Sequence, residues 1–188
     1  NDSNEYLKPV EVPKVKKRSG EVIRPTLSLL ISSEKDLHLC DNTTADIFYQ
    51  LPNSFSGDDA ELISMFTQNR RLIPWFPAIL IGDDYHAAVS FLKQVKPERI
   101  ATNNTGIAFE AYESNISWIA GPYLNLVNSY SLLCLKEHFN CDGAFLSNEI
   151  NKEQIWRVNK PDNFKLYYSL SHPITLMTSR VCMFHQVT

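Results

Sequence analysis

The stretch "RIATNNTGIAFEAYESNISWIAGP" (99–122) decides the fold, because it contains a strand, a helix and a second strand in immediate succession. Short apolar runs at 99–104 and 116–122 predict two buried strands. Residues 106–114 between them predict a short helix. A strand, a helix and a strand this closely spaced form a right-handed crossover between two parallel strands.

The same alternation continues on both sides of this unit. Asp58 and Ser129 are the expected N-caps of the helices that begin at these positions. Pro74 and Pro77 lie in the predicted strand 72–81, where prolines are unfavourable if the strand is central. We predict further strands at 26–32, 45–51, 72–81, 143–147 and 164–172, and helices after Ser33 and at 58–69, 83–95, 129–139 and 151–158.

Strands that alternate with helices at this spacing predict an α/β fold, a (β/α) TIM-barrel-like module with about seven parallel strands that is incomplete. An open doubly wound sheet is the alternative fold. This domain is assigned to residues 26–188. Residues 1–25 contain three prolines and a short basic run, and we interpret them as a linker or N-terminal arm, with a nucleic-acid contact as the alternative. Because the chain begins at Asn1, we expect it to be a piece of a longer protein.

Composition narrows the class of protein. The chain has 188 residues, of which 44% are hydrophobic and 21% charged, and a net charge of −3, so no strong basic field attracts nucleic acid. No apolar run has the 18 residues that a membrane span needs. The four cysteines form no CxxC pair, which favours a reducing, cytoplasmic location.

We expect these side chains to be core residues: Cys40, Cys134, Cys141, Trp75, Trp118 and Trp156. The helical histidines His38, His86 and His138 are expected at the surface.

Polar residues directly follow the last four predicted strands. In a parallel barrel these positions meet at one face, where ligands bind. Amides and hydroxyls with a single carboxylate suit hydrogen bonding to an oxygen-rich ligand, although the same residue types are common helix caps and turn residues. The expected rim consists of Asn103, Asn104, Thr105, Tyr123, Asn125, Asn128, Ser147, Asn148, Glu149 and His172.

Catalytic motifs are few. The sequence contains neither HExxH nor GxSxG nor GxGxxG. Cys182 with His172 or His185 leaves a Cys–His nucleophile open as an alternative.

One block resembles a known family. "GPYLNLVNSYSLLCLKEHFNCDGAFLSNEINKEQI" (121–155) is similar to the signature of the collagenase-like peptidase family, which reads LN-x-x-NS and then LS-x-E-x-N-x-x-x-I. "LYYSLSHPITLMTSRVC" (166–182) resembles the family's next strand and its cysteine-bearing loop, and "ERIATNNTGIAFEA" (98–111) also fits. The resemblance covers residues 26–188 and is greatest to the second, C-terminal barrel-like module of the long members.

The resemblance implies a role in hydroxylating a cytidine of large-subunit ribosomal RNA, with prephenate as a co-substrate. Relatives of the same fold modify tRNA or ubiquinone precursors. The family's name leaves a protease as an alternative, and a third possibility is a non-catalytic RNA-docking or structural module. The implied partners are the remaining domains of the same polypeptide, ribosomal RNA and a small polar ligand, without a membrane.

The resemblance also assigns residues. Cys182 corresponds to one ligand of an iron–sulfur cluster in the full-length protein, and the other ligands would lie outside this chain. Thr175 stands where other members have a second cysteine, and Ser171-His172-Pro173 replaces their His-Gly-Ala, so the full ligand set is not carried over. Glu149 is the expected acid–base group or hydroxyl anchor. The expected substrate-binding residues are Asn104, Asn125, Asn128, Asn148 and His172.

Overall fold

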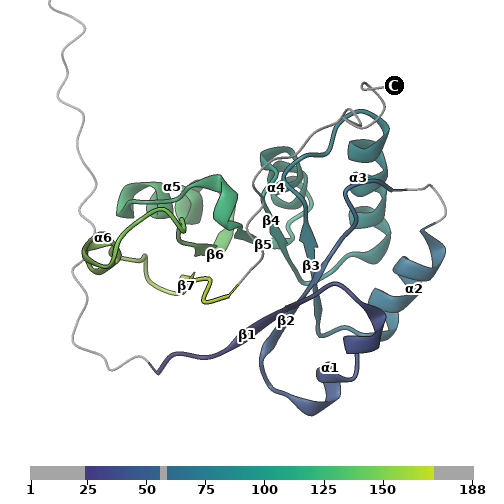
Figure 1. Cartoon of the computed structure of the whole chain (residues 1–188). Coiled ribbons are helices and arrows are strands. Elements are labelled where there is room, and N and C mark those ends of the chain that lie inside the picture. Colours follow the sequence, from purple (N-terminus) through teal and green to yellow (C-terminus); the bar gives the residue numbers. More distant parts are fainter. Residues whose placement is uncertain (1–23, 56–58, 172–188) are drawn as a thin grey trace, which may run out of the picture.

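A computed structural model describes residues 24–55 and 59–171 of the chain (Figure 1). Its seven strands form one parallel sheet whose spatial order is the order of the sequence. The doubly wound alternative would reverse the strand order at a switch point, so the barrel-like prediction is confirmed. The strands are β1 (Ser28–Ile31), β2 (Asp46–Gln50), β3 (Leu72–Phe76), β4 (Arg99–Thr102), β5 (Ser117–Ala120), β6 (Cys141–Phe145) and β7 (Lys165–Tyr167).

Helices connect the strands and cover the outer face of the sheet. The apolar stripe predicted for 83–95 is confirmed, because Ala88, Phe91, Leu92 and Val95 are buried there. The helices are α1 (Leu39–Asn42), α2 (Ala60–Gln68), α3 (Asp83–Val95), α4 (Thr105–Glu113), α5 (Ser129–Phe139) and α6 (Lys152–Arg157), with short 3-10 turns η1 (Glu34–Asp36) and η2 (Pro122–Leu124).

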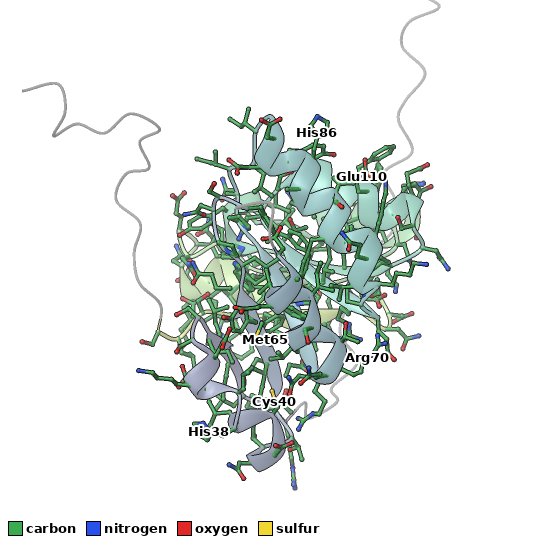
Figure 2. All side chains as sticks on the ribbon, turned by 90° about the vertical axis from the view of Figure 1, so that its right-hand side faces the viewer. His38, Cys40, Met65, Arg70, His86 and Glu110 are labelled. Atoms are coloured by element: carbon green, nitrogen blue, oxygen red, sulfur yellow. The ribbon has the colours of Figure 1, made fainter. Side chains whose placement is uncertain are left out.

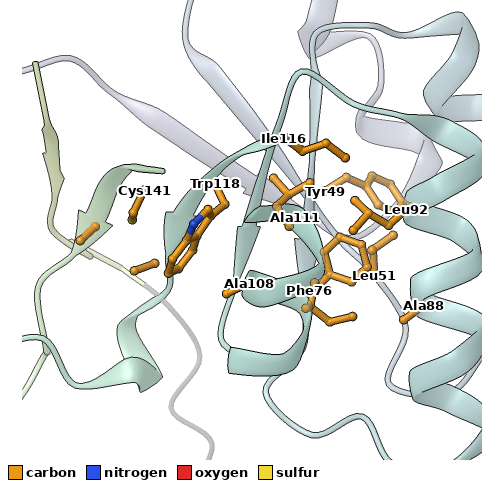
Figure 3. Packing of buried hydrophobic residues seen from close by; sticks show 14 of the residues in the cluster. Tyr49, Leu51, Phe76, Ala88, Leu92, Ala108, Ala111, Ile116, Trp118 and Cys141 are labelled. Atoms are coloured by element: carbon orange, nitrogen blue, oxygen red, sulfur yellow. The ribbon is translucent and has the colours of Figure 1, made fainter. Parts of the chain in front are cut away.

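The main hydrophobic core lies between the sheet and these helices (Figure 3). Phe66 and Phe76 both pack edge to face against Phe91 of α3, with ring centroids 5.4 and 6.1 Å away. Trp118 joins the core at the β5 end, where it lies beside Cys141. Burial on this face holds each helix against its two flanking strands.

A second cluster fills the concave face of the sheet. Its buried members are Phe48, Ala101, Ile119, Phe145 and Tyr167. Phe48 of β2 lies 5.8 Å, between ring centroids, from both Phe145 and Tyr167. Because β2 is not a sheet neighbour of β6 or β7, these contacts cross the interior and show that the sheet curls into an open half-barrel. The interior at this level is a packed aromatic layer.

Several boundaries differ from the predicted ones. The third strand ends at Phe76, before Pro77. It pairs with β4 only at Trp75 and Phe76. Pro74, directly before this pair, has no N–H to donate. The sixth strand begins at Cys141, two residues earlier than predicted, and the seventh is only Lys165–Tyr167.

Two predicted core residues are at the surface instead. Cys134 is exposed on α5, and Trp156 is 69% exposed on the short helix α6, whereas Cys40, Cys141 and Trp118 are buried as predicted. The histidine prediction is confirmed, since His38, His86 and His138 are all exposed. Figure 2 shows the first two at the periphery. Among the described residues, no helix is long and apolar enough to cross a membrane.

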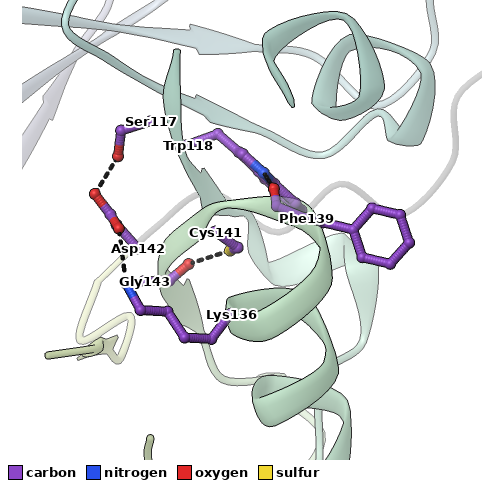
Figure 4. A network of polar contacts seen from close by, with 7 residues as sticks. All are labelled: Ser117, Trp118, Lys136, Phe139, Cys141, Asp142 and Gly143. Atoms are coloured by element: carbon purple, nitrogen blue, oxygen red, sulfur yellow. Dashed lines mark hydrogen bonds and ion pairs between the residues drawn. The ribbon is translucent and has the colours of Figure 1, made fainter. Parts of the chain in front are cut away.

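A polar network ties β5, α5 and β6 together (Figure 4). Ser117 Oγ donates to one carboxylate oxygen of Asp142, and Lys136 Nζ lies 3.1 Å from the other. Burial alone would raise the pKa of Asp142, but the bonds from Ser117 and Lys136 hold it below its ordinary value. Burial raises the pKa of the adjacent Cys141 to about 12, which leaves that thiol protonated and unreactive at neutral pH.

The Asp142 network predicts a specific acid sensitivity. A carboxyl group whose pKa is lowered by folding stabilises the fold above its unfolded pKa, and this contribution is lost as the pH falls through the lower, folded pKa. We therefore expect stability to decline below about pH 4. Asp142→Asn should make that decline shallower, as measured by urea unfolding across this range. An unchanged acid profile in the variant would contradict the role of the network.

The aromatic layer predicts a large cost for truncating its centre. Phe48 is 1% exposed and contacts three aromatic rings, so we expect Phe48→Ala to lower the free energy of unfolding by about 3–5 kcal/mol. Phe109, which is 54% exposed on α4, provides the control. Phe109→Ala should cost under about 1 kcal/mol. Urea denaturation measures both, and equal losses would show that the interior packing is not what stabilises the curl.

Candidate functional site

The carboxyl ends of β4, β5 and β6 form the candidate site. The buried polar side chains of the described residues are Thr102, Asn103 and Ser147, and all three lie at this end of the sheet. We call the loops that follow these strands, residues 103–104, 121–128 and 146–151, the rim. Parallel strands bring their carboxyl ends together at one edge, so residues distant in sequence meet there.

The end of β4 fastens two loops. Thr102 Oγ1 accepts a hydrogen bond from the backbone N–H of Asn104 at 2.9 Å. Asn103 Oδ1 accepts from the N–H of Tyr123 at 2.9 Å, which joins the β4 loop to the β5 loop. A Cβ atom added to Gly121 would lie 2.2 Å from Asn103 Oδ1, so only glycine allows this approach. These contacts position the rim and leave the Asn103 amide oxygen occupied.

Asn104 is a helix cap and a brace. Its Oδ1 accepts from the N–H of Ile107 at 3.1 Å and caps α4. Its Nδ2 donates to the carbonyl of Ala78 at 3.0 Å, in the loop after β3. Both the oxygen and the nitrogen of the Asn104 amide are therefore used to hold the structure together. The sequence had placed this residue among the ligand-binding candidates.

The start of α5 corrects a prediction. Ser129 was the expected cap, but Asn128 occupies that position, and its Oδ1 accepts from the N–H groups of Tyr130 and Ser131, both at 3.0 Å. Ser129 Oγ instead accepts from the N–H of Asn159 at 2.8 Å, which attaches the segment after α6 to α5. Both residue types cap helices well, so the sequence alone did not separate them.

The β5 and β6 loops are joined directly. The N–H of Ser147 donates to the carbonyl of Leu126 at 3.2 Å, and Ser147 Oγ accepts from the N–H of Glu149 at 3.3 Å. Asn151 then begins α6 with a reciprocal capping box to Gln154. The segments 124–129 and 146–155 are thus joined by the backbone bond between Ser147 and Leu126.

Two side chains of the rim remain for a ligand. Asn125 has a positive φ of 54°, a conformation that asparagine tolerates, and its side chain is exposed. Glu149 is also exposed, and its carboxylate makes no hydrogen bond with the described residues. Asn148 is exposed between them in the chain, but it is not without a partner. The rim therefore offers one carboxylate and one amide, a smaller set than predicted.

Three of the predicted residues, His172, Cys182 and His185, lie outside the described residues. Within residues 24–55 and 59–171, no group of three His, Cys, Asp or Glu side chains could hold a metal ion. Cys40, Cys134 and Cys141 are on α1, α5 and β6 and do not provide a cluster of thiolates. The described cysteines alone do not fit an iron–sulfur cluster.

Sequence reasoning missed three of the residues that help to organise the rim. Thr102, Ser129 and Asn159 were not among the expected site residues, and each makes a bond that fixes a loop. A small hydroxyl residue at the last position of an apolar strand was the available signal for Thr102. No comparable signal marks Asn159, because its contact to Ser129 joins segments 30 residues apart.

Comparisons with known proteins find no match. No protein-family model matches the chain, and neither the curated proteins nor the solved structures include one that is detectably similar.

The cap geometry predicts how substitutions of Asn128 behave. Asn128→Ala removes the acceptor of two backbone N–H groups and should lower the free energy of unfolding by about 1 kcal/mol. Asn128→Ser keeps a capping oxygen and should restore most of that loss. Chemical denaturation measures the series. If serine were as destabilising as alanine, the cap would not explain the choice of residue.

Proposed function

We propose that this chain is a barrel-like module of the collagenase-like peptidase family, and that its longer parent protein takes part in hydroxylating a cytidine of large-subunit ribosomal RNA. The observation that carries the proposal is the pairing of the two signature segments. LN-x-x-NS (124–129) and LS-x-E-x-N-x-x-x-I (146–155) meet on one rim through the bond between Ser147 and Leu126. A motif split over two loops that the fold reunites suits a ligand-facing surface.

The proposal gives four residues of the rim a role. Glu149 acts as the acid–base group or as an anchor for a hydroxyl of the ligand, because its exposed carboxylate is not used by the fold. Asn125 offers an amide on the neighbouring loop. Asn104 and Asn128 act indirectly, since their cap bonds fix the loops that carry the ligand contacts.

Residues outside the described part of the chain complete the proposal. Cys182 would contribute one ligand to an iron–sulfur cluster in the parent protein, and prephenate would be the co-substrate, with His172 near the ligand. The support for these assignments is the resemblance of residues 166–182 to the family. An iron–sulfur cluster of this type supplies redox chemistry when four ligands hold it.

A second candidate function is a non-catalytic docking or bracing module. Its support is that Asn103, Asn104 and Asn128 are engaged in fixing loops, while aromatic rings fill the interior beneath the rim. A module of this kind would present its rim to RNA or to another domain without doing chemistry. The protease alternative has no comparable support among the described residues.

The proposed role of Glu149 predicts a loss of RNA modification. A strain that lacks the parent gene is complemented with the wild-type parent, with Glu149→Gln or with Glu153→Gln, an exposed carboxylate on α6. Mass spectrometry of ribosomal RNA fragments then measures hydroxycytidine. We expect Glu149→Gln to lower the modified fraction at least tenfold, because the substitution removes the proton-transfer group. Glu153→Gln should behave as wild type.

The other outcomes separate the alternatives. Full modification with Glu149→Gln and with Asn125→Ala would favour the docking module. Unchanged modification in the deletion strain itself would overturn the proposed function. Cleavage of casein by the purified parent that disappears in Cys182→Ser would instead establish the protease.

A further inference from the structure

The rim continues into the loop after β3. Three hydrogen bonds of 3.2 Å or shorter join neighbouring loops: Asn104 Nδ2 to the carbonyl of Ala78, the N–H of Tyr123 to Asn103 Oδ1, and the N–H of Ser147 to the carbonyl of Leu126. The loop after β3, residues 77–82, therefore belongs to the same surface as the rim. A ligand bound at the carboxyl ends of these strands lies against this surface.

This surface is apolar and has no cation. Residues 77–82 and the rim contain no Lys, Arg or His, and Glu149 is their single carboxylate. Directly beyond these loops, Asp83 and Lys152 begin α3 and α6 with charges of opposite sign. An anionic group would find no opposite charge within the loops and would be repelled by Glu149. The large apolar side chains exposed on the loops are Ile79, Ile81, Tyr123 and Val127.

Tyr123 provides an exposed ring on a fixed backbone. It is the middle residue of η2, its N–H donates to Asn103 Oδ1, and the residue is 54% exposed. The N–H of Asn125 donates to the carbonyl of Pro122 at 3.3 Å and closes the turn. Because the aromatic layer fills the interior beneath the rim, a ligand lies on this surface and not in a deep pocket. A flat ring that stacks on a tyrosine suits such a surface.

Glu149 and Asn125 provide complementary hydrogen-bonding groups on two joined loops. Leu126, directly after Asn125, accepts the N–H of Ser147, and Ser147 Oγ accepts the N–H of Glu149. The carboxylate of Glu149 only accepts hydrogen bonds, whereas the amide of Asn125 both donates and accepts. A ligand that fits both side chains therefore carries an N–H donor for Glu149 and a carbonyl for Asn125.

We propose that the rim binds the cytosine ring itself, which stacks on Tyr123 and donates its exocyclic amine to Glu149, and that the anionic co-substrate binds outside the rim. Cytosine carries an amine where uracil carries a carbonyl, and carboxylate side chains accept hydrogen bonds from that amine. Proteins recognise unpaired RNA bases by stacking them on aromatic side chains and by hydrogen bonds to their edges. The choice of RNA as the source of the base rests on the proposed function.

The charge of Glu149 sets the specificity. A carboxylate accepts from the cytosine amine but repels the carbonyl oxygen that uracil has at the same position. The ring nitrogen next to the amine lies on the same edge of the base, so an acid–base role of Glu149 is compatible with this contact. Prephenate carries two carboxylates, and residues 77–82 and the rim offer it no cation.

Titrations of the 188-residue chain with cytidine and with uridine, followed by NMR, test the base site. The wild type should bind cytidine about fivefold more tightly than uridine. Glu149→Gln should abolish that preference, because a glutamine amide accepts from the amine or donates to the carbonyl. Tyr123→Ala should weaken the binding of both nucleosides about tenfold, and Tyr123→Phe should restore it. Phe109→Ala, which removes an exposed ring on α4, is the matched control and should change neither affinity.

Three outcomes overturn the proposal. Equal affinity of the wild type for the two nucleosides would show that Glu149 does not contact the edge of the base. Displacement of cytidine by prephenate would place the co-substrate on the rim. Absence of nucleoside binding would show that the apolar surface is not a base site and would favour docking of another domain of the parent protein.

The base site and the proposed function can fail separately. A preference for cytidine, together with unchanged ribosomal RNA modification in the deletion strain, would support the base site and overturn the hydroxylation. Loss of hydroxycytidine in Glu149→Gln, together with equal nucleoside affinities of the wild type, would support the hydroxylation and overturn the base site.

Discussion

The packing of Phe48 against the rings of β6 and β7 is the contact on which the shape of this domain depends. A parallel sheet with helices on one face has no intrinsic reason to curl far enough for its second and seventh strands to meet. Large aromatic side chains on the concave face supply that reason, because only curling removes them from water. Phe48, Phe145 and Tyr167 meet edge to face or stacked at the centre of the curl. The half-barrel is a consequence of this burial.

Filling the interior also determines where chemistry can occur. Aromatic side chains fill the interior that the curled sheet encloses. A ligand therefore reaches the strand ends and not this interior. At those ends, small polar side chains on strand or loop residues accept backbone N–H groups of the loops, as Thr102 does for Asn104 and Asn103 does for Tyr123. Each bond satisfies a donor that the turn would otherwise leave unpaired. The rim consequently consists of loop backbone that side-chain hydrogen bonds hold in place. Such an arrangement suits a preorganised binding surface.

Periodicity predicted the fold well where burial follows the local pattern. The bounds of α3 are those expected from its apolar stripe, because the whole stripe faces the sheet. Prediction failed where tertiary contacts decide. Cys141 begins β6 because it pairs there with Trp118 of β5, a contact that no local pattern contains. The seventh strand ends earlier than predicted because the apolar side chains of Tyr168 and Leu170 pack against none of the described residues and are exposed. Trp156 is exposed for a related reason, since the six-residue α6 places it away from the core.

The sequence identified residues that lie on the rim but not what most of them do, and the two segments 124–129 and 146–155 show why. Asn128, Ser129, Ser147 and Asn151 all bond to backbone groups, so the fold alone accounts for these letters of the pattern. Leu146 is buried, and Leu124 and Ile155 are partly buried against the core, which accounts for the three apolar positions of the pattern. Asn125 suits its left-handed turn. Glu149 is left as the one polar position of the pattern that neither a described contact nor its backbone conformation explains. Because the fold explains most positions of the pattern, the carboxylate of Glu149 is the group whose function has to be tested.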